Sequence, residues 1–517
     1  MPRATARRIL LVAIALGILV DIALPGHAAG LNAPIVMAAL LAAAFAIAGR
    51  AGLERFDPAD AWMPVAALGL TAMAALRADP WLVEADLLVA TALACGTLAA
   101  LAGARITRGL VPTVLNAAGA VLAAMFTGAL TVVQRPWPAV TDAGPVRARL
   151  GPWLPVARGL MLAVPIVLLF GLLFASADAV FASLARTALS LPVEIDVADV
   201  GQRTLIVAAV AWGAAGLLAL AAGGLPGLIP GPTSPAAPPA RSLGAASAAD
   251  LAAGGRPVAT IEAATVLYVV DALFAAFVVL QLAYLFGGRD TLAVAGMTYS
   301  DYARRGFFEL VAVAVLAGLL VVSLDLAVRR RSRAQLAAGI ALIALTGLVL
   351  ASALVRLRLY QDAYGWTELR FLVLVAIGWL AVALAVTAVL LVTRRTSWTM
   401  HALGILVVAT LAAMNIVGPQ AYVAERNLER AIDPTLVPPG GRSGLDGAYM
   451  ASLGDEAIPA VVASFDRLSV ADRAGLGAFL ARRNRQLASD PSLQGWPSLN
   501  VTRERARAAL DAWLAVR

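Results

Sequence analysis

The sequence contains no lysine, only two histidines and only one cysteine in 517 residues. Cys95 cannot form an intrachain disulfide or a cysteine-based metal cluster, and it lies in an apolar run, as small packed residues do. His27 and His401 are far apart in the chain, and no HExxH or CxxC motif is present. The sequence therefore predicts no metal site, no catalysis by a metal and no cofactor.

Charge is scarce as well. Charged residues make up 14% of the chain and hydrophobic residues 61%, whereas a soluble protein has about a quarter charged and about half apolar residues. The net charge of +8 comes from arginines that lie mainly at the ends of apolar runs, so we do not expect a nucleic-acid partner. The composition predicts that the main partner of this chain is a lipid bilayer.

The apolar residues come in continuous runs of roughly 17–25, the length of a helix that crosses the bilayer. Continuous runs favour helices over a β-barrel, whose strands alternate. We predict an all-α, polytopic transmembrane helix bundle of about 11–13 spans with a small C-terminal helical extramembrane domain. After a first helix near the N-terminus, which we expect to be retained rather than cleaved, the runs lie near 31–49, 61–76, 85–104, 110–133, 159–176, 200–222, 259–286, 306–328, 335–355, 371–393 and 400–418.

Changes in composition divide the chain. We expect N-terminal membrane helices over 1–133, a loop and middle helices over 134–222, a Pro/Ala/Ser-rich linker over 223–258, a second set of membrane helices over 259–418 and a helical tail over 419–517. In the tail, Ser469 and Asp472 have the spacing of a helix-capping box, and Leu510, Trp513 and Leu514 fall on one helical face.

Arginines indicate the orientation, because short cytoplasmic loops carry the excess of positive charge. The arginines of 329–333, Arg394 and Arg395 are expected inside, as is the N-terminus. Segment 356–370 and the tail are then extracytoplasmic, which requires an odd number of spans. The heavy use of alanine, glycine and arginine is typical of a GC-rich bacterial genome, so we expect the inner (plasma) membrane of a bacterium.

One carboxylate, Asp271, lies near the middle of the 259–286 run, at the depth where a charge is least stable. Such a group marks a pathway for a solute or forms a structural pair, for example with Tyr268. Both readings stay open.

A second group of polar residues flanks the hairpin over 306–355. Arginine forks and tyrosines bind phosphate or carboxylate well, but they also anchor helix ends at the headgroup level without any ligand. Glu309, at one end of the hairpin, could pair with an arginine of segment 356–370 at the other end. We take these residues as candidate binding residues: Arg304, Glu309, Arg356, Arg358, Tyr360, Tyr364, Thr367 and Arg370.

The chain resembles a bacterial family of multi-pass membrane proteins known as domain of unknown function 4173. The resemblance rests on LQLAYLFGG at 280–288, YARRGFFEL at 302–310, RLRLYQDAYGWTELR at 356–370, Asn415, AERNLER at 424–430 and LDGAYMASLGDEAIPAV at 445–461. It implies a helical bacterial inner-membrane protein without an established activity. This chain has Gln420 where the resemblance implies an acidic residue after Asn415.

Three functions remain possible. The first is binding or transport of a small anionic solute or lipid headgroup by the arginines and tyrosines. The second is a non-enzymatic scaffold or sensor that presents its tail, residues 419–517, to an envelope protein. The third is a membrane transferase for a lipid-linked substrate with Asp271 or Glu309 as its base. We favour the two functions without catalysis and assign no residue as catalytic.

Overall fold

Every regular element in the described part of the chain is a helix. The computed structural model describes residues 12, 15–101, 106–107, 154–178, 181–185, 260–287, 307–328, 331–438, 441–442 and 444–517. Two compact units share them: the first takes Met1–Val111, Leu359–Val375 and Leu403–Arg517, and the second takes Pro112–Arg358 and Ala376–Ala402. Each unit is considered by itself below. The expected all-α fold is confirmed.

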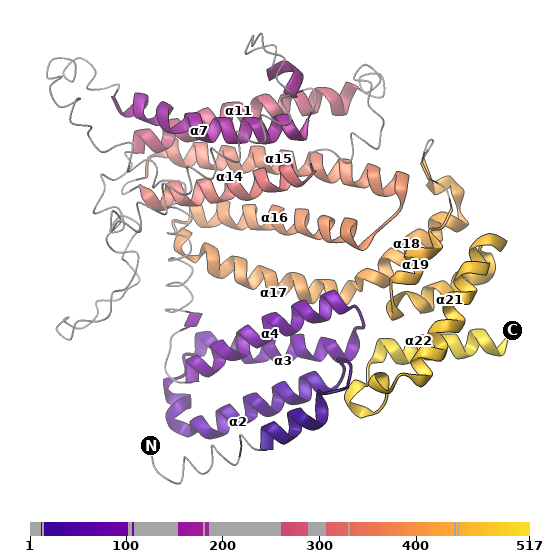
Figure 1. Ribbon diagram of the computed structural model, residues 1–517. Helices are drawn as coiled ribbons and strands as arrows, with labels where there is room; N and C mark the ends of the chain where they lie inside the picture. Colours follow the sequence, from indigo (N-terminus) through magenta and orange to yellow (C-terminus); the bar gives the residue numbers. More distant parts are fainter. Residues whose placement is uncertain are drawn as a thin grey trace. The chain divides into compact units, whose positions relative to one another are not determined.

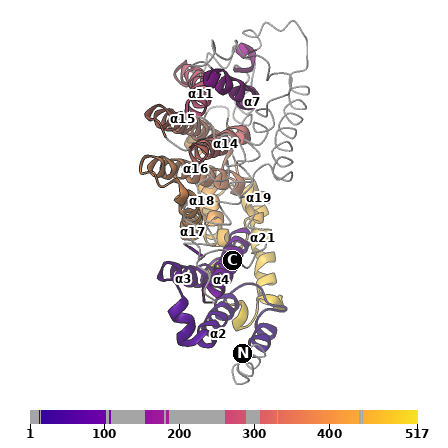
Figure 2. The ribbon, with the colours of Figure 1, turned by 90° about the vertical axis from the view of Figure 1, so that its left-hand side faces the viewer.

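In the first unit, three apolar helices pack side by side (Figures 1 and 2). They are α2 (Asn32–Arg55), α3 (Trp62–Leu76) and α4 (Pro80–Leu101). Their buried side chains are mostly Met, Leu and Ala. Leu411 of α17 (Thr399–Val417) packs against the same cluster. Proline at the first position and the Asp79 carboxylate before it begin α4, because proline has no amide hydrogen to leave unpaired.

The second unit contains α7 (Leu154–Ala177), α11 (Thr260–Gly287), α14 (Phe307–Ala327) and most of α15 (Arg333–Tyr364) and α16 (Glu368–Val392). Helices α7 and α11 lie side by side (Figures 1 and 2). Phe174 of α7 stacks on Phe277 of α11 with ring centroids 3.9 Å apart. Gly159 permits a close approach of these helices, because a Cβ there would lie 2.6 Å from Cβ of Thr265.

Seven of the described helices are long and apolar enough to cross a membrane: α2, α3 with the turn before it, α4, α7, α11, α15 and α16. An eighth span results if α17 and α18 (Pro419–Ile432), which meet at 47°, form one bent span. Helix α14 coincides with the expected span over 306–328. The chain is therefore a multi-pass membrane protein. The expected spans at 110–133 and 200–222 and the linker over 223–258 lie outside the described residues, so the number of 11–13 spans stays a prediction.

One segment differs from the expected organisation. We expected the second span of the hairpin to end near residue 355, but α15 continues to Tyr364. Its 32 residues correspond to about 48 Å at 1.5 Å per residue, more than the roughly 30 Å of hydrocarbon. The segment after the apolar run, rich in Leu, Arg and Tyr, contains no proline or glycine before Gly365. Nothing in this segment therefore prevents the helix from continuing through it.

Two arginine-rich turns of the second unit lie at the same end of their helices. Arg331, between α14 and α15, donates to Thr396 Oγ1 over 2.9 Å and to Leu391 O over 2.9 Å. Arg331 also pairs with Asp325, and Thr396 Oγ1 donates to Asp325 Oδ2 over 2.9 Å. Arg331 thus joins the connection between α14 and α15 to the turn at 393–398, as expected for two loops on one side of a membrane.

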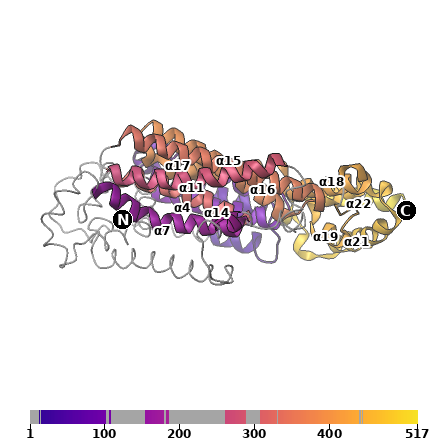
Figure 3. The same ribbon diagram turned by 90° about the horizontal axis from the view of Figure 1, so that it is seen from above.

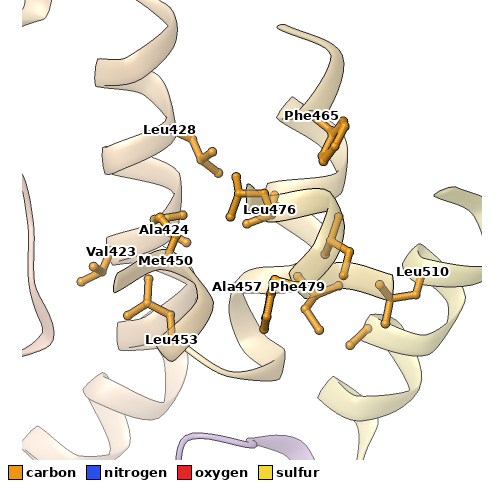
Figure 4. Close-up of a cluster of buried hydrophobic side chains, with 14 of the residues drawn as sticks. Val423, Ala424, Leu428, Met450, Leu453, Ala457, Phe465, Leu476, Phe479 and Leu510 are labelled. Atoms are coloured by element: carbon orange, nitrogen blue, oxygen red, sulfur yellow. The ribbon is translucent and has the colours of Figure 1, made fainter. Parts of the chain in front are cut away.

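The tail consists of α18, α19 (Gly447–Ser452), α20 (Ile458–Ser464), α21 (Val470–Ser489) and α22 (Val501–Ala515), with short 3₁₀ turns between them. Figure 3 shows its labelled helices gathered beyond the end of α17. Their apolar side chains form a core of their own, part of which Figure 4 shows, with Leu428 of α18, Leu476 and Phe479 of α21 and Leu510 of α22. Trp366 and Phe371, from the turn between α15 and α16 and the start of α16, belong to this core.

Ser469 and Asp472 pair at the predicted helix start, because Ser469 is the N-cap of α21, its Oγ accepts from the Asp472 amide over 3.2 Å and it donates to Asp472 Oδ2 over 2.7 Å. Leu510 and Trp513, on the predicted common face of α22, both pack in this core. Leu514 is 41% exposed.

Candidate functional site

Four candidate residues meet at the turn between α15 and α16. The Arg370 guanidinium lies 4.1 Å from the centre of the Tyr360 ring, and the rings of Tyr360 and Tyr364 are 5.1 Å apart. Arg370 Nη1 donates to the carbonyls of Tyr364, over 3.2 Å, and of Gly365. Thr367 Oγ1 accepts from the Arg370 amide over 3.2 Å. The guanidinium thus caps the carboxyl end of α15, where carbonyls have no partner within the helix.

A second arginine, from the tail, caps the same helix end. Arg430 of α18 donates to the carbonyls of Gln361, over 2.6 Å, of Asp362, and of Ala363, over 3.3 Å. Because both arginines donate to backbone oxygens, their donors stabilise the turn instead of facing an open anion site.

The same turn is tied to the tail by two further side chains. Asn427 Nδ2 donates to Trp366 O and Trp366 N donates to Asn427 Oδ1, both over 2.8 Å. The Tyr449 hydroxyl accepts from the Glu368 amide over 2.7 Å. Gly365 has φ +81°, and a Cβ there would lie 2.8 Å from Asn427 Oδ1. Only glycine therefore fits between α15 and α18.

Arg356 has different partners, in the second unit. It is buried, and its Nη2 donates to Asp178 Oδ2 over 3.0 Å and to Gln281 Oε1 over 2.8 Å. Gln281 Nε2 donates to Asp178 Oδ2 over 3.0 Å, and Ser352 Oγ donates to Gln281 Oε1 over 2.6 Å. This network joins α11 and α15 to the residue that follows α7. Arg356 therefore has the role of a buried ion-pair partner.

The remaining candidates are dispersed. Arg304 lies outside the described residues. Glu309 lies in the first turn of α14 and is half-buried, and Arg358 is on α15. Asp271 is buried, and neither of its oxygens has a hydrogen-bond partner among the described residues. The expected bond with Tyr268 is not formed, since that hydroxyl donates to Ala334 O over 3.4 Å.

The most unusual polar arrangement of the first unit includes residues that the sequence did not single out. Glu456, before α20, is 4% exposed and lies against the turn between α3 and α4. Its Oε1 accepts from the amide of Ala78 over 3.0 Å and from that of Asp79 over 3.4 Å. Its Oε2 has no hydrogen-bond partner among the described residues, and Arg77 Nη1 is 3.8 Å away. The Asp79 carboxylate is also buried, where it accepts from the amides of Trp81 and Leu82 at the start of α4.

A third carboxylate completes the group. Gln420 of α18 is 4% exposed, and its Nε2 donates to Glu368 Oε1 over 2.9 Å. The Gln420 Oε1 has no partner among the described residues. We call Asp79, Glu368, Glu456 and Gln420 the junction cluster, because they come from membrane helices and from the tail. Gly418, with φ +69°, provides the break between α17 and α18 that directs Gln420 toward it.

The electrostatics of the junction cluster are those of buried like charges. Burial and the charges of Glu368 and Glu456 raise the pKa of Asp79 to about 6, although its bonds to Leu82 and Trp81 lower it. Burial raises the pKa of the Tyr449 hydroxyl to about 12, so it stays neutral. Asp86 of α4 is buried too, and its Oδ2 accepts from Asn415 Nδ2 over 2.8 Å.

This arrangement is suited to holding a proton. Among the described residues, no group of three or more His, Cys, Asp or Glu side chains can hold a metal ion. The buried carboxyl of Asp86, beside the junction cluster, could have been recognised from the sequence, because Asp86 lies in an apolar run as Asp271 does. The positions of Glu456 and Gln420 could not, since they lie more than 300 residues from Asp79 in a tail of ordinary composition.

Comparison with known proteins gives one match. The model of the family Domain of unknown function (DUF4153) matches residues 64–464. No curated protein and no solved structure matches the chain. We expected an uncharacterised family from the resemblance, and the matching family is uncharacterised. Its number is not the expected one, because the model that matches is DUF4153 and not domain 4173.

Proposed function

The chain belongs to the family Domain of unknown function (DUF4153), and we propose that it is a non-enzymatic membrane scaffold that presents its helical tail to a protein partner. This proposal rests on the hydrogen bonds that join the tail to the membrane helices of the first unit. Hydrogen bonds from polar side chains and from the backbone join it to three separate segments. A tail needs such fixation if its surface has to keep one orientation.

At the turn between α3 and α4, Asn500 Nδ2 donates to the carbonyls of Ala74 and Arg77 over 2.8 and 2.7 Å. Thr502 Oγ1 donates to Leu76 O over 2.7 Å. These bonds give the last carbonyls of α3 partners from the tail and bury the side chain of Asn500, which is 1% exposed.

Before α2, the backbone of the tail takes part. The amide of Ala28 donates to Ser492 O over 2.9 Å, and the amide of Leu31 donates to Leu499 O over 3.0 Å. Gly30 lies so close that a Cβ would be 2.7 Å from Leu499 O. At the turn between α15 and α16, Asn427, Arg430 and Tyr449 form the third attachment.

The other two functions have weaker support. Binding of an anion by the arginines competes with their present bonds, because Arg370 and Arg430 donate to carbonyls and Arg356 to Asp178. A transferase with Asp271 as its base needs a second group beside that carboxyl, and none of the described residues hydrogen-bonds to it.

We further propose the inner membrane of a bacterium as the location, with the tail outside the cytoplasm. Support comes from Arg331, Arg394 and Arg395, which the positive-inside rule assigns to the cytoplasm, and from the bond of Arg331 to Thr396, which places their two connections together. The partner is then a protein of the cell envelope.

The test uses a photo-crosslinking amino acid at Val470 and at Val516, which are 76% and 85% exposed on the tail, in the full-length protein in cells. A scaffold gives crosslinks to one defined protein, identified by mass spectrometry. The crosslinks weaken when Asn427→Ala loosens the tail. The proposal is refuted if both positions crosslink only to lipid or to nothing while the protein is inserted and folded.

A further inference from the structure

The junction cluster brings three carboxylates and a carboxamide together in the first unit, where Asp79, Glu456 and Gln420 are buried and Glu368 is half-buried. Asp79 and Glu456 are each 4% exposed. The Asp79 amide donates to the Glu456 carboxylate, so their backbone and side chain are in direct contact. Glu368 reaches the group through Gln420. Full ionisation would give three negative charges in a region with little access to water, which is unfavourable.

One ion pair offsets part of this charge, and among the described residues it leaves two of the three carboxylates without a cation. Arg77 Nη1 lies 3.8 Å from Glu456 Oε2, and Arg77 Nη2 donates to Ile416 O. On α4, Asp86 is a further buried carboxyl group, and its Oδ2 accepts from Asn415 Nδ2 over 2.8 Å. On α19, Tyr449 stays neutral, and Arg370 of α16 donates to carbonyls of the turn.

The neighbouring arginines of the tail bind residues outside the junction cluster. Arg483 of α21 pairs with Asp455 through its Nε over 2.7 Å and its Nη2 over 2.9 Å. Arg503 of α22 donates to Ser498 O and Ala29 O, both over 2.9 Å. The excess negative charge therefore belongs to the junction cluster itself.

Two buried oxygens of the cluster also lack a donor. Neither Glu456 Oε2 nor Gln420 Oε1 has a hydrogen-bond partner among the described residues. Buried acceptors without a donor are rare in native proteins, because each loses its bond to water on burial. A proton bound to one of the carboxylates removes a negative charge and adds one O–H donor to the group.

We propose that the junction cluster is a proton-binding site, and that its proton holds the tail against the membrane helices. Release of the proton leaves like charges on α4, α16 and the segment before α20. Their repulsion favours separation of the tail from the turn between α3 and α4. The site makes the docking of the tail dependent on the pH of the compartment into which the tail projects. The inference requires a docked tail but no protein partner, so it does not depend on the scaffold function.

The direction of the pH dependence follows from the raised pKa of Asp79. The folded state binds this proton more tightly than the unfolded chain, whose aspartates have a pKa near 3.8. The stabilisation is therefore complete below about pH 3.8 and is lost as the pH rises through about 6. Docking of the tail is expected to weaken between pH 5 and pH 8.

The experiment measures amide hydrogen exchange of α20 and α22 in the full-length protein in detergent at several pH values between 5 and 8. Asp79→Asn keeps an N-cap side chain for α4 but cannot ionise. Asp511→Asn is the matched control, since this aspartate of α22 is exposed. Comparison with wild type at each pH cancels the intrinsic effect of pH on exchange.

We expect the three proteins to exchange alike at pH 5. At pH 8, α20 and α22 should exchange about tenfold or more faster in wild type and Asp511→Asn than in Asp79→Asn. Gln420→Glu, which adds a carboxyl to the cluster, should increase the change with pH. Equal exchange in wild type and Asp79→Asn at every pH would overturn the proposal. If Asp79→Asn does not fold, Glu456→Gln replaces it, with the same expected and contrary results.

Discussion

Asn427 and Trp366 exchange two hydrogen bonds of 2.8 Å, one in each direction. The carboxamide of a tail residue thereby satisfies both backbone groups of a residue in the turn between two membrane helices. Trp366 itself is 7% exposed and belongs to the core of the tail. The pair shows on a small scale how the first unit is built, since the turns of the membrane helices form part of the folded tail.

Loss of this pair should loosen the tail. Asn427→Ala removes both of these hydrogen bonds from Trp366, a buried residue, so we expect a loss of about 2 kcal/mol in unfolding free energy. Arg426→Ala is the control, because it removes an exposed ion pair with Glu429 and a contact with the Tyr422 ring, and it should cost less than about 1 kcal/mol. Thermal unfolding in detergent measures both, and equal losses would show that the pair does not stabilise the tail.

Gly365 should not tolerate a side chain. Its φ of +81° is unfavourable for alanine, and the added Cβ would overlap Asn427 Oδ1 at 2.8 Å. We expect Gly365→Ala to destabilise the protein by about 2 kcal/mol. Gly447→Ala is the matched control, since a Cβ at that position has no neighbour within 4 Å and φ is not positive. If both variants melt at the same temperature as wild type, the turn adapts and the proposed rigidity is wrong.

Several features of this fold could be predicted from the sequence for a clear reason. An apolar run of 20 residues needs no distant partner to be recognised, so α2, α11 and α16 lie within a few residues of their expected positions. The sequence did not predict that α15 continues to Tyr364. Its polar last turns are capped by Arg370 and Arg430, and the sequence does not show which carbonyl groups these arginines bind.

The candidate residues show the same limit. Arg356 and Arg370 look alike in the sequence, yet one pairs with Asp178 and the other caps a helix. Asp79 and Glu456 were not identified as candidate residues, since an aspartate before a proline and a glutamate in a soluble tail are common. Only the fold brings them into contact, across more than 370 residues of chain.

Arg370 offers a direct test of the two interpretations of the arginines and tyrosines. If Arg370 stabilises the turn, Arg370→Ala should lower the melting temperature, because α15 loses a cap and Tyr360 loses its contact with the guanidinium. Titration with inorganic phosphate or anionic phospholipid should leave the melting temperatures of wild type and Arg370→Ala unchanged. Arg482→Ala, an exposed arginine of α21, controls for loss of charge. A rise in wild-type melting temperature with phosphate that is absent in Arg370→Ala would instead favour an anion site.

The network around Arg356 gives the last prediction. Arg356→Met should strongly destabilise the second unit, by about 3–5 kcal/mol, because the Asp178 carboxylate would remain buried without its ion-pair partner. The double variant Arg356→Met/Asp178→Leu removes both charges and should recover part of that loss, since no unpaired ion remains. Unfolding in mixed micelles measures the unfolding free energy of each single variant and of the double variant. If the double variant is as unstable as the sum of the two single ones, the charges act independently, and the 3.0 Å pair between Arg356 and Asp178 is not what joins α15 to the end of α7.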